Sequence, residues 1–234
     1  MTDRPWRIIV DRAVADDGTV LWPGYFTPEV VADLRRQLGT YLFSAQYQNN
    51  PLPVEGGLVR SEWIRYAEAV PSEAVVVQGV DPAISLNESA DQFAHVTVAA
   101  GPDGRIVVVE AFAGRLTFGR QVEFIETAAR RHHPARIVIE TVAYQQALHQ
   151  QLQQCTRLPV RPVTPSGSKA SRVVRLAARL EAGQVVLLKG LDSLEEQLLG
   201  FPRMRYDDLV DALAYAVEGA ASAGRTAPCR LRGV

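Results

Sequence analysis

The sequence predicts an α/β fold in which helices cover both faces of a mixed sheet. Short apolar runs rich in β-branched residues recur along the chain, and helical patterns separate most of them. The first three runs, however, follow one another without a helix. Strands joined directly are antiparallel neighbours and strands joined through a helix are parallel, so the sheet is expected to begin antiparallel and to continue parallel.

Three antiparallel strands are expected first, at 74–81, 93–101 and 105–114. The run AVVVQGVD at 74–81 is almost continuously apolar, which indicates a strand buried on both faces. The tripeptide Pro-Asp-Gly at 102–104 separates the second strand from the third and is typical of a hairpin. His95 lies on the second strand and is expected in the core of the sheet.

From residue 118 onward, helices and strands alternate. Helices are expected at 118–132, 144–154, 168–182, 191–199 and 207–220, and strands at 135–141, 158–163 and 184–189. Helices that connect parallel strands pack on the faces of the sheet, which completes a layered domain.

The first seventy residues do not follow this pattern. We expect an N-terminal arm or linker at 1–70, the main domain at 71–222 and a flexible tail at 223–234. The arm carries five of the fourteen prolines, and its stretch 43–59 is rich in Asn, Pro and Gly. Such a composition is typical of an irregular connection rather than of a packed core.

Two local elements are nevertheless expected in this arm. Trp6–Val10 is a short apolar segment that fits a strand. Thr27 followed by Pro28 indicates a helix start, because threonine caps free N–H groups and proline fits the first turn. The helix is expected to end near Gly39.

Composition excludes several classes of function. Lys and Arg number 25 and Asp and Glu 26, so the net charge is −1 and the chain is neither a strongly basic DNA-coating protein nor an acidic disordered one. A local basic groove is compatible with this total. Because the sequence has no signal-peptide pattern and no apolar run of membrane-spanning length, we expect a cytoplasmic protein.

Acidic residues mark three of the expected elements. Asp81 and Glu140 end two buried strands, and the carboxyl ends of strands are where open α/β sheets hold ligands. Asp207, Asp208 and Asp211 begin the last helix at spacings that allow one shared face. A turn after the first strand and a capped helix start would also explain single acids at these places. Two such charges about 4 Å apart repel by about 4 kcal/mol at an effective dielectric constant near 20, so the group needs a positive partner.

Two kinds of positive partner are open. Arg203 and Arg205 are close in sequence and are candidates for ion pairs with the acids. We favour a divalent metal, because oxygen ligands without Cys pairs or a required His suit Mg²⁺ or Mn²⁺. Carboxylates from two strand ends and one helix can hold two ions about 3.5–4 Å apart, which is the arrangement that hydrolyses phosphodiesters.

One expected helix carries a basic stripe. The residues are spaced by three, three and four positions and therefore share one face: Lys169, Arg172, Arg175 and Arg179. A solvated helix face is the ordinary interpretation of such a stripe. The alternative is contact with DNA phosphates, which positions DNA without reading its sequence.

Several segments, in order, resemble the C-terminal nuclease domain of the large terminase subunit of tailed bacteriophages. They are LWPGYF (21–26), AQYQNNPLPVEGGLVRSEWI (45–64), GVDPA (79–83), VIET (138–141) and DDLVDALAYA (207–216). The resemblance covers nearly the whole chain. It implies a ribonuclease H-like fold and metal-dependent cleavage of concatemeric viral DNA during genome packaging.

The resemblance also implies catalytic residues. Asp81, Glu140 and Asp208 occupy positions like those of the family's catalytic acids, and Asp211 resembles the fourth acid of the related Holliday-junction resolvases. Asp81 is expected to bridge two ions, with Glu140 on one and Asp208 or Asp211 on the other. Which of Asp207, Asp208 and Asp211 bind metal is open.

Partners follow from the same resemblance. They are double-stranded DNA, the small terminase subunit, the portal and the packaging ATPase domain, in the cytoplasm of an infected or lysogenic bacterial host. Large terminases carry an ATPase with a P-loop, whereas this sequence contains no G-x-x-x-x-G-K-[ST]. Residues 1–70 are therefore expected to be a remnant of the end of that ATPase domain. A catalytically idle docking module and a Holliday-junction-resolvase-like nuclease are the alternatives.

Overall fold

A computed structural model describes residues 10–51, 57–83, 92–141, 146–164 and 167–223. The chain divides into two compact units, Met1–Gly56 and Gly57–Val234. The candidate strand at Trp6–Val10 lies outside the described residues except for its last position, and the expected tail lies outside them from residue 224 onward. None of the described helices combines the length and the apolar character that a membrane crossing requires.

The first unit is organised by helix α1 (Pro28–Tyr47), which starts where the sequence predicts. Thr27 caps it, since its side chain accepts a hydrogen bond from a backbone N–H of the first turn. Near the expected end, Gly39 leaves the helical conformation with a φ of 70°, and a second helical stretch follows this kink and continues to Tyr47. Beyond the kink Phe43 is buried and stacks on Tyr47, with ring centroids 5.5 Å apart.

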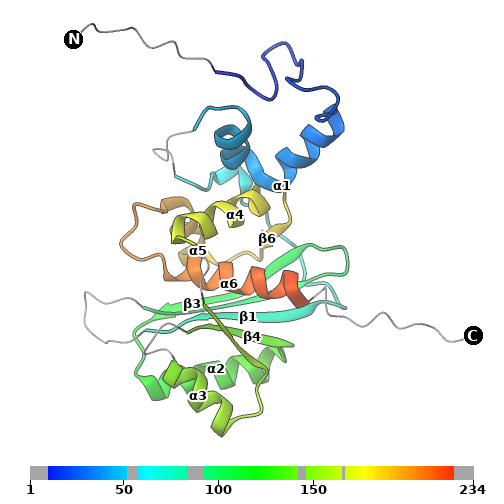
Figure 1. The fold of residues 1–234 in the computed structure, drawn as a ribbon. Coiled ribbons are helices and arrows are strands. Elements are labelled where there is room, and N and C mark those ends of the chain that lie inside the picture. The colour runs from blue at the N-terminus through cyan, green and yellow to red at the C-terminus, as the bar shows by residue number, and fades with distance from the viewer. Residues whose placement is uncertain (1–9, 52–56, 84–91, 142–145, 165–166, 224–234) are drawn as a thin grey trace, which may run out of the picture. The chain divides into compact units, whose positions relative to one another are not determined.

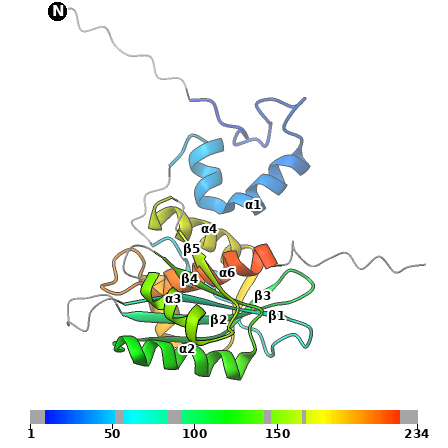
Figure 2. The same cartoon turned by 60° about the horizontal axis from the view of Figure 1, so that its bottom comes forward.

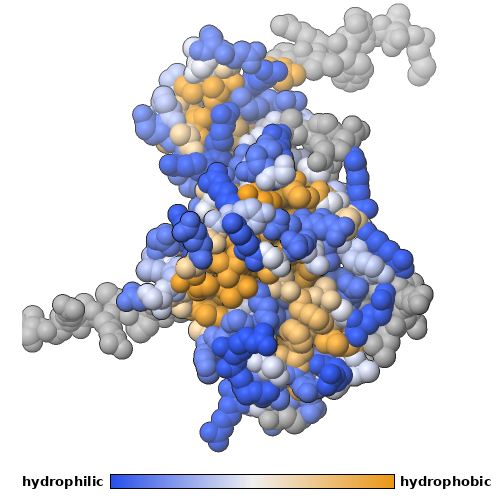
Figure 3. All heavy atoms as spheres, turned by 180° about the vertical axis from the view of Figure 1, so that it is seen from behind, coloured by the Kyte–Doolittle hydropathy of each residue, from blue (hydrophilic) through white to orange (hydrophobic). Residues whose placement is uncertain are grey.

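Aromatic side chains of the LWPGYF segment lie on the surface of this unit. Trp22 and Tyr25 are 62% and 64% exposed and stack on each other at 5.3 Å between ring centroids. Figure 3, which colours one face of the molecule by hydropathy, shows apolar patches on both units.

The second unit contains a six-stranded sheet in the order β5-β4-β1-β2-β3-β6 (Figure 1). The strands are β1 (Val75–Asp81), β2 (Phe93–Ala100), β3 (Ile106–Gly114), β4 (Arg136–Glu140), β5 (Val160–Val163) and β6 (Val185–Leu187). β1, β2 and β3 pair antiparallel, while β4, β5 and β6 join in parallel. The predicted mixed sheet is confirmed, and β2 is buried along almost its whole length, as expected of a central strand.

Helices cover both faces of this sheet, as Figures 1 and 2 show. Their bounds are α2 (Phe118–His132), α3 (Gln146–Cys155), α4 (Lys169–Glu181), α5 (Asp192–Gly200) and α6 (Asp208–Ala223). α2 and α3 lie on one face, and α6 lies along the other with α4 and α5 packed against it. These bounds agree with the expected ones within a few residues, although the start expected for α3 at 144 lies outside the described residues.

Residues 57–70 belong to the second unit, so the division between the units differs from the boundary expected after residue 70. Backbone bonds hold this segment there. Leu187 N donates to Arg65 O at 2.9 Å, and Ala67 N donates to Leu187 O at 2.8 Å. A short 3₁₀ turn, η2 (Ser61–Trp63), precedes them.

Candidate functional site

Two of the predicted site residues end neighbouring parallel strands. In the β1–β4 pair, Val80 lies opposite Ile139. Asp81 and Glu140 come one residue later on each strand, so they lie side by side at the carboxyl edge of the sheet, and both are partly buried. The pairing of β4 beside β1 in the sheet is what brings them together.

Helix α6 brings the other acids to the same edge. It runs antiparallel to β1, because Gly219 near its end approaches Val77 and Ala212 near its start approaches Gly79. The first turn of α6 therefore lies at the carboxyl end of β1. Asp208 and Asp211 in this turn are buried, each with 4% of its surface exposed.

The pKa of Asp81 reflects the burial of its side chain and the acids around it. Burial is the main cause that raises the pKa of Asp81 well above its usual value. Three nearby carboxylates raise that pKa further: Glu140, Asp211 and Asp208. The ammonium group of Lys169 acts in the opposite direction. The four carboxylates thus share one electrostatic environment, and nearby positive charge favours the ionised form of Asp81.

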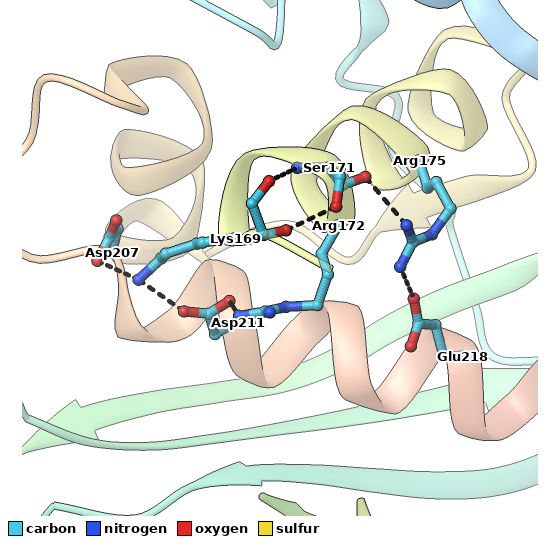
Figure 4. A network of polar contacts seen from close by, with 8 residues as sticks. Lys169, Ser171, Arg172, Arg175, Asp207, Asp211 and Glu218 are labelled. Carbon is cyan, nitrogen blue, oxygen red and sulfur yellow. Dashed lines mark hydrogen bonds and ion pairs between the residues drawn. The ribbon is translucent and has the colours of Figure 1, made fainter. Parts of the chain in front are cut away.

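Two cations of α4 point into the acidic group (Figure 4). Lys169 Nζ lies 2.6 Å from Asp207 Oδ1 and 2.6 Å from Asp211 Oδ2. Arg172 Nη2 lies 2.8 Å from Asp211 Oδ1. Each carboxylate oxygen of Asp211 therefore faces one cation. Ser168 supports this arrangement by capping the start of α4 through a bond from Ser171 N at 3.2 Å.

Both cations remain charged in this environment. Burial alone would lower the pKa of Lys169, but its hydrogen bonds to Asp207 and Asp211 outweigh burial and raise that pKa. Burial would likewise lower the pKa of Arg172, and the Asp211 carboxylate outweighs it in the same way. The protein itself thus supplies part of the positive charge that the acids require. It comes from a helix 39 residues away in sequence from Asp211, whereas the sequence pointed to the nearby Arg203 and Arg205.

The four basic residues of α4 do not form one solvated stripe. Lys169 and Arg172 turn inward, and Arg172 is only 7% exposed. Arg175 is exposed and donates to Glu218 Oε1 at 2.8 Å, and Arg179 is partly exposed. Of the four, Arg175 therefore presents the largest surface to a nucleic acid.

Tyr215 is a neighbour of the site that sequence reasoning missed. It lies four residues after Asp211 on α6 and is 1% exposed. The guanidinium carbon of Arg172 lies 5.5 Å from the centroid of its ring. The helical spacing from Asp211 was the available signal, but a tyrosine in an apolar helix looks like any other core residue.

His95 is in the core, as predicted. Its side chain is fully buried and meets the Phe124 ring edge-on at 5.3 Å between centroids. Burial, together with the charge of His132, lowers the pKa of His95 to about 3, so the ring is neutral.

The donor set suits a divalent ion by its chemistry. Carboxylates from β1, β4 and α6 lie near one edge of the sheet and influence one another, and such ligands match Mg²⁺ and Mn²⁺. Among the described residues, no three His, Cys, Asp or Glu side chains are already grouped as a metal site. Asp211 in particular directs both oxygens at α4 cations, so a metal bound there requires Lys169 or Arg172 to move.

Comparison with known proteins places this arrangement in context. The family model described as "Terminase RNaseH-like domain" matches residues 78–219, which include all five acids. Among curated proteins no sequence matches the chain.

Solved structures with the same fold come from bacteriophages. The large terminase nuclease of thermophilic phage G20c with bound magnesium is 17% identical with a TM-score of 0.54, and the match covers 71% of this chain and 98% of that one. The large terminase of another thermophilic bacteriophage is 10% identical with a TM-score of 0.65, over 83% of this chain and 52% of that one. The g2p nuclease domain of bacteriophage SPP1 with bound Mn is 14% identical with a TM-score of 0.50, over 69% and 98%. At these identities the likeness shows a shared fold.

Proposed function

Because the chain belongs to the terminase RNaseH-like domain family, we propose that it is a metal-dependent DNA endonuclease that cuts concatemeric phage DNA during genome packaging. The observation that carries this proposal is that four carboxylates lie within electrostatic reach of one another near the carboxyl ends of β1 and β4: Asp81, Glu140, Asp208 and Asp211. Nuclease domains with the same fold have been solved with bound magnesium and manganese.

We assign these acids to two Mg²⁺ or Mn²⁺ ions. Asp81 would contact both ions, Glu140 one of them, and Asp208 or Asp211 the other. Asp207 is a further candidate ligand, since its carboxylate reaches Lys169 beside Asp211. When bound, the ions would supply an activated water and neutralise the charge that develops on the cleaved phosphodiester.

The same family membership supports the proposed partners. Double-stranded DNA would be the substrate, with Lys169, Arg172, Arg175 and Arg179 as candidate phosphate contacts. Arg175 is the most exposed of the four, and Lys169 and Arg172 are already paired with acids of the site. We further propose that the part of the expected arm that forms the first unit, Met1–Gly56, derives from the end of a packaging ATPase domain. The portal and the small terminase subunit would be the protein partners, in the cytoplasm of the bacterial host.

Nicking of supercoiled plasmid DNA tests the activity. The chain with Mn²⁺ should nick the plasmid, while Asp81→Asn and Asp208→Asn should lose at least about 100-fold in rate, because a missing ligand weakens metal binding and transition-state stabilisation together. Glu123→Gln is the matched control, since Glu123 is an exposed acid on α2 that pairs with Arg120. If the chain left the plasmid intact, or if the Asp81 and Asp208 variants nicked it as fast as the control, the nuclease proposal would fail.

A catalytically idle packaging module is the second candidate. The observation that favours it is the full engagement of Asp211 by Lys169 and Arg172, which resembles a structural ion-pair network. It predicts a folded chain that neither binds Mn²⁺ in calorimetry nor nicks DNA. A strong preference for four-way junctions over linear duplex would instead indicate a resolvase-like nuclease.

A further inference from the structure

One buried polar side chain beside the acids has no part in the proposal above. Tyr215 follows Asp211 by one helical turn and Asp208 by two, so the three residues lie along one face of α6. The tyrosine side chain is 1% exposed. Its hydroxyl has no hydrogen-bond partner among the described residues.

An unpartnered hydroxyl at this depth is unusual. A buried polar group without a hydrogen bond costs about 1–3 kcal/mol, and the large majority of buried side-chain polar atoms in proteins have a partner. Phenylalanine would fill the same space without that cost. The presence of tyrosine rather than phenylalanine at position 215 therefore indicates that the hydroxyl gains an acceptor when the neighbouring acids rearrange to bind a ligand.

Acceptors are close at hand. Burial raises the pKa of Tyr215, and so do the nearby carboxylates of Asp211, Glu140 and Asp81. A phenol is protonated at neutral pH and can donate a hydrogen bond. Glu140 is close enough to become its acceptor, although the present geometry falls short of a hydrogen bond.

The ring is held in place from its other side. The guanidinium of Arg172 lies over it at 5.5 Å, which is within the range of a cation–π contact. The same guanidinium donates to Asp211 Oδ1 at 2.8 Å. Arg172 thus contacts both Asp211 and Tyr215.

We propose that Tyr215 is a positioning residue whose hydroxyl donates a hydrogen bond to the Glu140 carboxylate and orients it for metal binding. The inference rests on the proposed function, because it assumes that Glu140 is a metal ligand. Removing a hydrogen-bond donor that orients a metal ligand typically lowers metal affinity by 10–100-fold. A single neutral hydroxyl is expected near the lower end of that range.

The variant Tyr215→Phe isolates this role, because it removes the hydroxyl and keeps the ring. Titration calorimetry with Mn²⁺ should show an affinity about 10-fold lower than that of the unchanged chain. The melting temperature in EDTA should stay the same or rise, since the variant loses an unsatisfied polar group. Tyr66→Phe is the matched control. Tyr66 is 48% exposed, and its hydroxyl donates to Glu195 Oε2 at 2.7 Å. That control should leave the Mn²⁺ affinity unchanged.

The possible results separate this inference from the proposed function. Unchanged Mn²⁺ affinity in Tyr215→Phe, with binding lost in Glu140→Gln, would overturn the positioning role and leave the metal site intact. A loss of affinity accompanied by a lower melting temperature in EDTA would indicate a packing role and would overturn it as well. If the unchanged chain did not bind Mn²⁺ at all, the metal site itself would be refuted, and the positioning role with it.

Discussion

Replacing Gly79 by alanine is expected to push α6 away from β1. A Cβ atom at this position would lie 2.1 Å from Ala212 O, 2.6 Å from Ala216 N and 3.0 Å from Ala216 Cβ. The two closest atoms are backbone atoms of α6, so no side-chain rotation relieves the clash. The helix would have to retreat by roughly 1 Å to restore ordinary van der Waals contact.

The expected loss of stability depends on which atoms the new Cβ would clash with. Overpacking in a well-packed core typically costs about 1–3 kcal/mol, and contact with helix backbone places Gly79→Ala in the upper part of that range. For a domain of this size each kcal/mol lowers the melting temperature by about 2–4 °C, so a drop of roughly 4–12 °C is expected. Because α6 carries Asp208 and Asp211, the affinity for Mn²⁺ should fall as well.

Thermal unfolding followed by circular dichroism measures the first effect and titration calorimetry the second. Gly119→Ala is the matched control, because a Cβ on Gly119 in α2 meets nothing within 4 Å. Alanine there should be neutral or should stabilise the chain by up to about 1 kcal/mol. If Gly79→Ala melted within about 1 °C of the unchanged chain, the close contact between β1 and α6 would be refuted.

Three further predictions concern basic side chains. Arg172→Met leaves a buried carboxylate with one cation fewer and should cost about 3–5 kcal/mol in urea unfolding with EDTA, whereas Arg175→Met, which breaks an exposed pair with Glu218, should cost less than about 1 kcal/mol. Equal costs would contradict the difference in burial. The pKa of His95 is lowered to about 3 in the folded chain, so between pH 7 and pH 5 the unfolded chain binds a proton at this histidine and the folded chain does not. The free energy of unfolding should therefore fall by about 2 kcal/mol from pH 7 to pH 5. His95→Leu should lose that part of the pH dependence, and an unchanged slope would count against a neutral buried ring. Finally, Arg175→Ala with Arg179→Ala should weaken DNA binding and flatten its salt dependence, which filter binding at several salt concentrations can show; an unaltered slope would argue against a DNA contact on this face.

Much of the fold was predictable because its strongest signals are local. The apolar run of β1 and the Pro-Asp-Gly turn before β3 predict the antiparallel strands that open the sheet, and the helices between the later strands predict that those strands join in parallel. Gly39 marks the limit of such signals. Its positive φ interrupts the helix as expected, but the burial of Phe43 in the following turns depends on packing within the first unit, which no local pattern contains.

The acids of the candidate site were predictable for a related reason. Asp81 and Glu140 end parallel neighbours, and this topology leaves few other places for them. The direction of the α4 cations was not predictable. Their spacing shows that they share one face of the helix, but only the packing of α4 on α6 decides that Lys169 and Arg172 face Asp211. A pattern within one helix carries no information on what that helix covers.

This packing links two properties that the sequence presents as separate. Both oxygens of Asp211 face α4 cations, so an ion bound at Asp211 and the α4–α6 ion pairs draw on the same carboxylate. By thermodynamic linkage, whatever strengthens the ion pairs weakens ion binding by the same free energy, and the reverse also holds. If Asp211 binds metal as proposed, Lys169 and Arg172 become available to a phosphate group only when they leave it. More of the basic residues of α4 would then contact DNA phosphates when metal is bound to the acids than when it is absent. The salt dependence of DNA binding should therefore be steeper with Mn²⁺ than with EDTA.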